Sequence, residues 1–316
     1  MSHFSVAVIM DGKKSLEEIL APYEEQTTNK KYLKFNDVED EYRQTYENEG
    51  EETVRMSADG SLKSVYDEEF MVEITKEEFE TLREKGGVRL TTRWNNGDNV
   101  CYRYDYGDNE VITVPYTEMY ATFEEYMKKE HEYDKRDKKT NRYGYWFNPN
   151  AKWDWWQVGG RWQGLLKSKT GKIGEKSLVY PREVKEGCYD IARIGDIDFT
   201  PDEEEKQRAT RFWEVVVEGQ SLREGEAKDD FASFWKKEYY LDQYGTKEQY
   251  ARECSEMSTF AVVTPDGKWH EKGEMGWFGC SSETGEEARE WHNSWQDAFI
   301  KNEDPDNVLV IVDCHI

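Results

Sequence analysis

The stretch "HFSVAVIM", residues 3–10, and the stretch "VLVIVDCHI", residues 308–316, lie at the two ends of the chain. Each is a short apolar run rich in β-branched residues, a pattern typical of a strand that is covered on both faces. Asp11 and Gly12 follow the first run and form a turn signal. We therefore expect both terminal runs to be strands, placed as neighbours in a central sheet.

Helix and strand patterns interleave between these two runs without a regular period. A capping box from Thr75 to Glu78 and the pair Thr200-Pro201 are typical helix starts. The patterns predict helices over 15–23, from about 38, over 75–86, 122–132, 229–244 and 286–300, and from 200 and 246. They also predict a strand over 211–219 and a hairpin over 258–272. This mixture favours an α+β fold whose central sheet is mostly antiparallel, contains both terminal strands and has helices packed on it.

Residues 51–140 differ in sequence pattern from the rest of the chain. Runs of alternating polarity over 88–116 are separated by Asn-Gly and Gly-Asp turns, which predicts a three-stranded β-meander. We expect residues 1–50 and 141–316 to form the core α+β domain. Residues 51–140 are then an inserted subdomain made of the meander and helices.

The composition indicates a folded protein with an acidic surface. The 316 residues carry a formal net charge of −24, and 35% of them are charged. Aromatic residues make up 14% of the chain, which supplies a core despite a mean hydropathy of −1.00. Such a charge disfavours direct binding to nucleic acids and to anionic membranes. It serves either solubility, the commoner cause, or mimicry of nucleic-acid charge.

The five cysteines are widely spaced, and no CxxC pair is present. A thiolate zinc site or a redox motif is therefore not expected, and no cofactor is expected either. The first residues lack a basic segment and a cleavage site, and no run reaches membrane-spanning length. These features predict reduced thiols and a cytoplasmic protein.

Residues 146–164 hold five of the twelve tryptophans. The composition of this block is typical of a pocket that stacks a base and pairs an anionic group. Glycines 159 and 160 allow a close backbone approach. The candidate ligand-binding residues are Lys152, Trp153, Trp155, Trp156, Arg161 and Trp162.

The alternative is that these indoles pack in the core. Alternation along a strand would direct Trp153, Trp155 and Gln157 to one side, with Asp154 and Trp156 on the other. Core packing is about as probable as ligand binding for any one of the tryptophans. It is less so for Arg161, because arginine is seldom buried without a partner.

Pairing of the terminal strands would bring His3, Asp313 and His315 together. Two imidazoles and a carboxylate suit a divalent metal and make these residues the alternative catalytic set. The commoner explanation is two histidines at frayed strand ends, because no HxH or HxxxH spacing supports a metal.

Two further stretches hold residues that could do chemistry. The acids of "DVEDEY", residues 37–42, suit a metal or a general base, although a solvated helix N-terminus is the simpler interpretation. The loop "WHEKGEMGWFG", residues 269–279, lines a pocket or forms a turn. The phosphate-loop, dinucleotide, GxSxG and HExxH motifs are absent.

Several blocks resemble a widespread, uncharacterised family encoded by bacteriophages and mobile elements. They are "MSHFSVAVI", "EEILAPYEE", "FNDVEDEY", "NPNAKWDWWQVGGRW", "DGKWHEKGEMGWFG" and "VIVDCHI". The resemblance covers about the first fifty residues and the second half, and residues of about 50–140 lie outside it. It implies no catalytic residue. It implies a phage accessory protein, for which evasion of host defence is a common role.

We therefore expect an anti-defence protein that sequesters a small anionic, nucleotide-like immune signal in the host cytoplasm without catalysis. One alternative is a hydrolase that degrades such a signal with a metal site of His3, Asp313 and His315. A second is an acidic decoy that binds a host defence protein. An oligomer is compatible with all three, and the chain is more typical of a binding protein than of an enzyme.

Overall fold

A computed structural model of the chain describes residues 2–57, 60–95, 98–107, 111–170, 187–276 and 279–316. It confirms a mixed α+β protein with several antiparallel sheets. The chain divides into two compact units, Met1–Lys34 with Asn148–Ile316 and Phe35–Phe147. The first unit is discontinuous in sequence and contains both chain ends.

The division differs from the expected one, in which the inserted segment spans residues 51–140. Strand β2 (Lys34–Asp37) pairs with β10 (Tyr143–Phe147), which draws both flanks into the second unit. Tyr42 and Tyr46 pack against a buried aromatic cluster centred on Tyr126. Burial of these rings within the second unit explains why its boundaries lie at residues 35 and 147.

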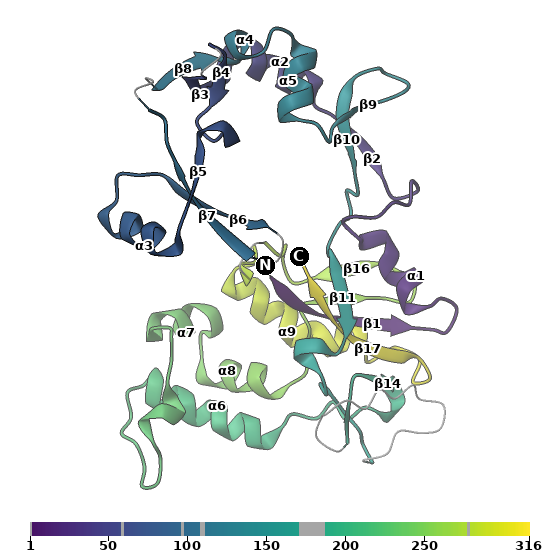
Figure 1. The fold of residues 1–316 in the computed structure, drawn as a ribbon. Helices are drawn as coiled ribbons and strands as arrows, with labels where there is room; N and C mark the ends of the chain where they lie inside the picture. The colour runs from purple at the N-terminus through teal and green to yellow at the C-terminus, as the bar shows by residue number, and fades with distance from the viewer. Residues whose placement is uncertain (1, 58–59, 96–97, 108–110, 171–186, 277–278) are drawn as a thin grey trace. The chain divides into compact units, whose positions relative to one another are not determined.

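A six-stranded sheet organises the first unit, in the order β11-β17-β1-β15-β16, with β14 also paired to β17. Strands β1 and β17 are antiparallel over eight residues, from His3 opposite His315 to Met10 opposite Val308. Ser2 and Ile316 exchange backbone hydrogen bonds beyond them, and the chain ends lie together in Figure 1. The strands are β1 (His3–Met10), β11 (Trp155–Val158), β14 (Ile191–Arg193), β15 (Ala261–Val263), β16 (Trp269–Glu271) and β17 (Val308–His315).

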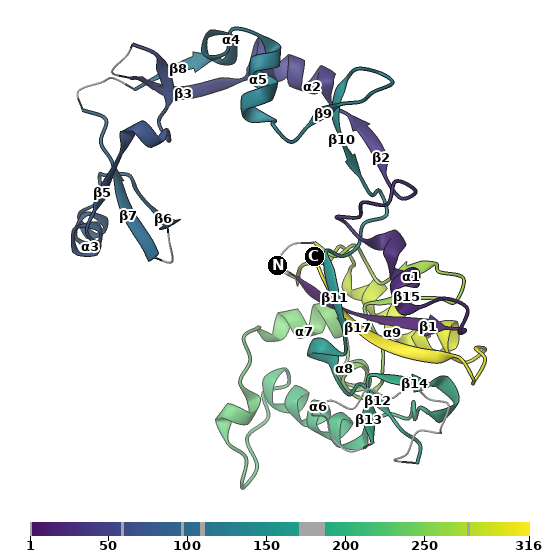
Figure 2. The ribbon, with the colours of Figure 1, turned by 45° about the vertical axis from the view of Figure 1, so that its right-hand side comes forward.

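Both faces of this sheet are covered, as the unbroken apolar runs require. On one face, Val6 and Val312 belong to a core that includes Ile19 and Leu20 from α1 (Leu16–Leu20). On the other face, Ile311 belongs to a core that includes Trp295 from α9 (Gly285–Phe299). Figure 2 shows α1 and α9 against strands β1 and β17.

The helices between β14 and β15 correct one prediction. Residues 211–219 are not a strand, because α6 extends over Glu203–Val216 from its N-cap at Asp202. Ala209 and Trp213, four residues apart, are the buried residues of one helix face, and this tertiary burial overrides the local β-propensity of the valines. The next helix begins at residue 237, later than expected. The remaining elements of this unit are α7 (Lys237–Tyr244), α8 (Lys247–Ser255), β12 (Leu166–Lys167) and β13 (Cys188–Tyr189).

The second unit contains three small sheets, β2-β10-β9, β4-β3-β8 and β5-β7-β6. The expected meander over 88–116 is wrong in its third strand. Strands β6 and β7 form the hairpin, but β8 pairs with β3, a strand about sixty residues earlier. The elements are α2 (Glu39–Gln44), β3 (Glu51–Met56), β4 (Leu62–Ser64), β5 (Met71–Ile74), α3 (Lys76–Lys85), β6 (Leu90–Asn95), β7 (Asp98–Tyr104), β8 (Val111–Pro115), α4 (Tyr116–Met119), α5 (Phe123–Glu130) and β9 (Lys135–Arg136).

None of the helices in the described ranges combines the length and the apolar character needed to cross a bilayer.

Candidate functional site

The strand register places three rings in a row at one end of the central sheet. His315 lies opposite His3 of β1 and opposite Trp155 of β11. Directly paired residues share a face, so the three side chains leave the sheet on the same side. One rung further in, Asp313 lies opposite Ser5 and Gln157 on this face.

These two rungs interrupt an apolar surface. The same face continues with Ala7 and Ile311, which are fully buried in the core beside α9. The opposite face stays apolar to its end, at Phe4 and Cys314. The polar rungs are therefore confined to one face of one end of the sheet.

Asp313 holds His3 in place from inside the protein. Its side chain has no exposed area, and its Oδ1 accepts a 2.8 Å hydrogen bond from Nδ1 of His3. Its Oδ2 accepts from the backbone N–H of Arg161 at 3.0 Å and from Nε2 of Gln157 at 3.4 Å. Burying a carboxylate costs several kcal/mol unless such donors surround it.

His315 is oriented in the same way by a second carboxylate. Its Nδ1 lies 2.6 Å from Oδ1 of Asp154. Because a carboxylate oxygen accepts, we assign the Nδ1 proton to both rings. The Nε2 atoms of His3 and His315 have no hydrogen-bond partner among the residues that the structure describes.

Trp155 completes the group as a half-exposed platform. Its indole stacks on His315, with centroids 5.4 Å apart and planes 19° apart, and 41% of the residue is exposed. The rings of His3 and His315 meet edge to face at 4.9 Å. We call His3, His315, Trp155, Asp154 and Asp313 the His–Trp cluster. The strand pairing continues to its last residues, so its histidines do not lie at frayed ends.

The glycine pair after β11 brings Arg161 to this cluster. Gly159 and Gly160 have φ of 71° and 53°, values that side-chain-bearing residues rarely adopt. A Cβ on Gly160 would lie 2.3 Å from Oδ2 of Asp313. This close approach lets the Arg161 amide reach the carboxylate. The Arg161 side chain is exposed and has no ion pair or hydrogen bond with any described residue.

The structure does not bring the four predicted indoles into one wall. Trp153 is buried in the core beside α1, where it meets Trp156 edge to face at 6.5 Å. Trp162 packs against the core on the other face of the sheet. Lys152 forms an ion pair with Glu271, with Nζ 2.5 Å from Oε1. Of the predicted ligand-binding residues, Trp155 belongs to the cluster through its side chain, and Arg161 contacts it through its backbone amide.

The donor set does not support the metal site that was considered as an alternative. His3, Asp313 and His315 are neighbours, but Asp313 bonds to the ring of His3 instead of converging with it on an empty centre. Over the described ranges, no group of three or more histidine, cysteine or acidic side chains is arranged to hold a metal. The arrangement suits proton transfer by two oriented imidazoles.

Asp154 is the cluster residue that the sequence analysis missed. The pairing of β11 with β17 determines its place, and a single sequence gives little signal for a pair about 160 residues apart. Only its position between two tryptophans, in a block with an arginine, draws attention to it.

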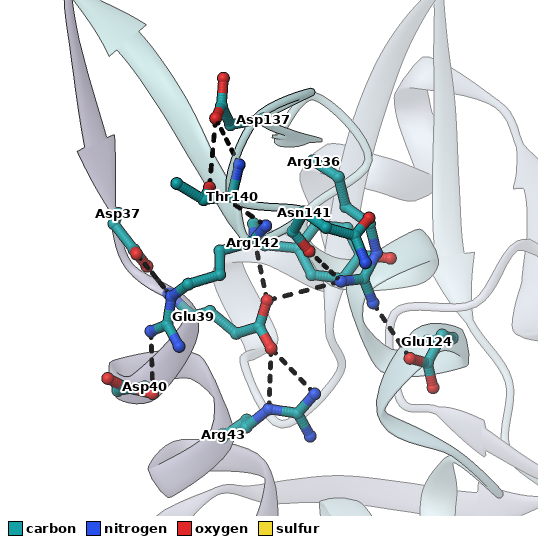
Figure 3. A network of polar contacts seen from close by, with 11 residues as sticks. Asp37, Glu39, Asp40, Arg43, Glu124, Arg136, Asp137, Thr140, Asn141 and Arg142 are labelled. Atoms are coloured by element: carbon teal, nitrogen blue, oxygen red, sulfur yellow. Dashed lines mark hydrogen bonds and ion pairs between the residues drawn. The ribbon is translucent and has the colours of Figure 1, made fainter.

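Asp37, Glu39 and Asp40 have structural roles in the second unit, as Figure 3 shows. Glu39 is buried and accepts from Nε and Nη2 of Arg43 at 3.0 and 2.9 Å and from the Tyr143 amide at 3.0 Å. Burial acts to raise the pKa of Glu39, but these donors outweigh it and lower that pKa. Arg142 pairs with both Asp37 and Asp40. These carboxylates are held by arginines and are not arranged as a metal site or a general base.

The loop of residues 269–279 has a structural role where it is described. Glu271 pairs with Lys152, and His270 packs on Phe299 at 5.3 Å between ring centroids. Burial lowers the pKa of His270. Trp277 lies outside the described residues.

A comparison with protein-family models, with curated proteins and with solved structures finds no match to this chain.

Proposed function

We propose that this protein binds a small anionic, nucleotide-like ligand at the His–Trp cluster. The observation that carries the proposal is the half-exposed Trp155 indole, fixed on an oriented imidazole. The exposed Arg161 adjoins the same cluster through its backbone amide, which binds Asp313. An indole face stacks on any base, and this contributes about 1–3 kcal/mol. The guanidinium supplies charge-assisted hydrogen bonds to a phosphate or carboxylate.

The charge of the protein favours a small ligand over a nucleic acid. With a net charge of −24, the surface repels a polyanion that needs many cationic contacts. A single cation beside an aromatic platform is enough for one or two phosphates. We propose that the ligand is a signalling nucleotide of a host defence system, and that its capture takes place in the host cytoplasm. The resemblance of several sequence blocks to a family encoded by bacteriophages and mobile elements is the reason for proposing this context.

Binding is tested by calorimetry with ADP-ribose and with cyclic dinucleotides. Trp155→Ala and Arg161→Ala should each weaken binding by roughly 5- to 150-fold, which corresponds to about 1–3 kcal/mol. Trp94→Ala is the matched control, because this indole is 75% exposed and lies in the second unit. If both cluster variants bind as the wild type does, with their folds intact, the proposal is wrong.

Sequestration has a separate readout. Ligand that is bound, released by heat and recovered unchanged indicates capture alone, whereas altered ligand indicates turnover. A host protein as the partner, the acidic-decoy alternative, would instead show binding that weakens steeply with salt and survives Arg161→Ala.

A further inference from the structure

We infer that the His–Trp cluster also cleaves ribonucleotide phosphodiesters, by attack of the ribose 2′-hydroxyl on the adjacent phosphorus. This activity rests on the proposed binding function and goes beyond it. His3 and His315 form the acid–base pair, and the substrate provides the nucleophile.

The two imidazoles of the cluster lie close together and are anchored in the same way. Each ring is anchored through Nδ1 by its own carboxylate, and each has a second nitrogen without a partner among the described residues. The ring centroids are 4.9 Å apart, so one bound phosphodiester can touch both rings. One neutral and one protonated imidazole supply the base and the acid that such a cleavage needs. A binding site alone would not require two buried or half-buried carboxylates behind its histidines.

The nucleophile in this reaction comes from the substrate and not from the protein. The hydroxyl and thiol side chains on the cluster's strands and next to their ends are those of Ser2, Ser5 and Cys314, and each is engaged or faces away. The Ser5 hydroxyl accepts from the backbone N–H of Phe260 at 3.1 Å. The Ser2 hydroxyl is held between Gly276 and Gly279. Cys314 lies in the core on the opposite face, where burial raises the pKa of its thiol well above the usual range.

The ribose 2′-hydroxyl can act in place of a protein nucleophile, because little entropy is lost in bringing it to the phosphorus. It is covalently held beside the phosphorus, and such intramolecular placement is worth effective molarities of 10⁵ M or more in well-oriented systems. The two imidazoles, each anchored by a carboxylate, then supply the acid and the base.

The step is balanced without a further reactant. The neutral imidazole takes the proton of the 2′-hydroxyl, and the 2′-oxygen bonds to phosphorus. The bond from phosphorus to the 5′-oxygen of the next nucleoside breaks, and the protonated imidazole gives its proton to that oxygen. The products are a 2′,3′-cyclic phosphate and a 5′-hydroxyl, and water returns the two rings to their starting protonation states.

Asp313 and Asp154 are positioning residues in this scheme. They fix which nitrogen of each ring carries the proton and which faces the ligand. Asp154 is the better one to vary, because its side chain is 27% exposed whereas that of Asp313 is wholly buried.

The experiment uses the full chain with adenylyl-3′,5′-adenosine and, as matched controls, its 2′-deoxy and 2′-O-methyl forms. The wild type should release adenosine 2′,3′-cyclic phosphate, seen by phosphorus NMR, in the presence of EDTA. It should bind both controls but leave them intact.

His3→Asn and His315→Asn keep a donor near the Nδ1 position and remove the acid or base. Each should lower the cleavage rate by roughly 10²- to 10⁴-fold while binding of the 2′-O-methyl form changes little. Asp154→Asn should lower the rate in the wild type but add no further loss to His315→Asn, which a general loss of stability would not produce.

The outcomes separate the two proposals. Binding of all three dinucleotides without cleavage, or equal cleavage of the 2′-deoxy form, overturns this inference and leaves the binding function standing. Failure to bind any of the nucleotides tested, ADP-ribose and cyclic dinucleotides included, overturns both.

Discussion

At the scale of single residues, the site depends on a carboxylate placed where the fold alone would favour an apolar side chain. Asp313 is flanked in sequence by Val312 and Cys314, both fully buried on the opposite face, and Ile311 precedes it on its own face. Its burial is tolerable because three donors converge on it, including the amide that the glycine turn presents. The same contacts that stabilise this carboxylate orient His3.

Gly160→Ala tests how tightly the turn is fitted to Asp313. The positive φ alone should cost about 1–2 kcal/mol, and the new Cβ, 2.3 Å from the carboxylate, about 1–3 kcal/mol more. Gly12→Ala is the matched control, with φ of 77° and no atom within 4 Å of its Cβ. Urea unfolding should show the larger loss for Gly160→Ala, and equal losses would mean that the turn has room to adjust.

At the scale of elements, the sequence predicted best where burial is continuous and local. The apolar runs that become β1 and β17, and the 3.6-residue pattern that becomes α9, determine their own structure. The prediction of secondary structure and of strand pairing failed where contacts with residues distant in sequence determine the structure. Residues 211–216 are helical because they belong to α6, which packs mainly against α8. Strand β8 pairs with β3 instead of with its sequence neighbour β7.

The prediction of the site was limited in the same way, by contacts between strands that are distant in sequence. The apolar runs predict that His3, Asp313 and His315 lie near one another, because only the two terminal strands are involved. Trp155 and Asp154 join them through the pairing of β11 with β17, which no local pattern encodes. The Trp-rich composition drew attention to the segment that carries Asp154 and Trp155, but most of its indoles pack in the two cores.

Helix α9 carries a buried histidine that should make stability depend on pH. His292 bonds through Nδ1 to the Ser258 hydroxyl at 2.7 Å. Its Nε2 has no hydrogen-bond partner among the described residues, and the Glu256 carboxylate lies 3.9 Å away. Burial is the main cause that lowers the pKa of His292 to about 4, against about 6.5 when unfolded. The unfolded chain then binds the extra proton between these values. The contribution of His292 is complete above pH 6.5 and is lost as the pH falls toward 4.

The expected loss is about 2 kcal/mol between pH 6.5 and pH 5, at roughly 1.4 kcal/mol per pH unit. Urea unfolding at pH 7.5, 6.5, 5.5 and 5.0 measures it. His292→Gln keeps a polar side chain without a titration, so its stability should fall less over this range. If the free energy of unfolding falls equally with pH in the wild type and in His292→Gln, the pKa of His292 is the same in the folded and unfolded chains, and the prediction is wrong.

At the scale of the whole molecule, the described chain is two folding units joined at two points. Every sheet lies within one unit: the six-stranded sheet and β12-β13 in the first, and the three small sheets in the second. The buried core clusters are likewise confined to one unit each. The first unit also contains the whole His–Trp cluster.

The first unit should therefore fold and bind without the second. Strands β2 and β10 begin and end the second unit and are neighbours in one sheet, so residues 34 and 148 can be joined by a short Gly/Ser linker in place of residues 35–147. We expect this variant to unfold in one cooperative transition and to bind nucleotide within a few-fold of the full chain, because all the cluster residues and both of their supporting cores remain. Calorimetric unfolding and titration with the same ligand measure the two properties. A folded variant that no longer binds would place part of the binding determinant in residues 35–147 and would contradict the assignment of the site to the central sheet alone.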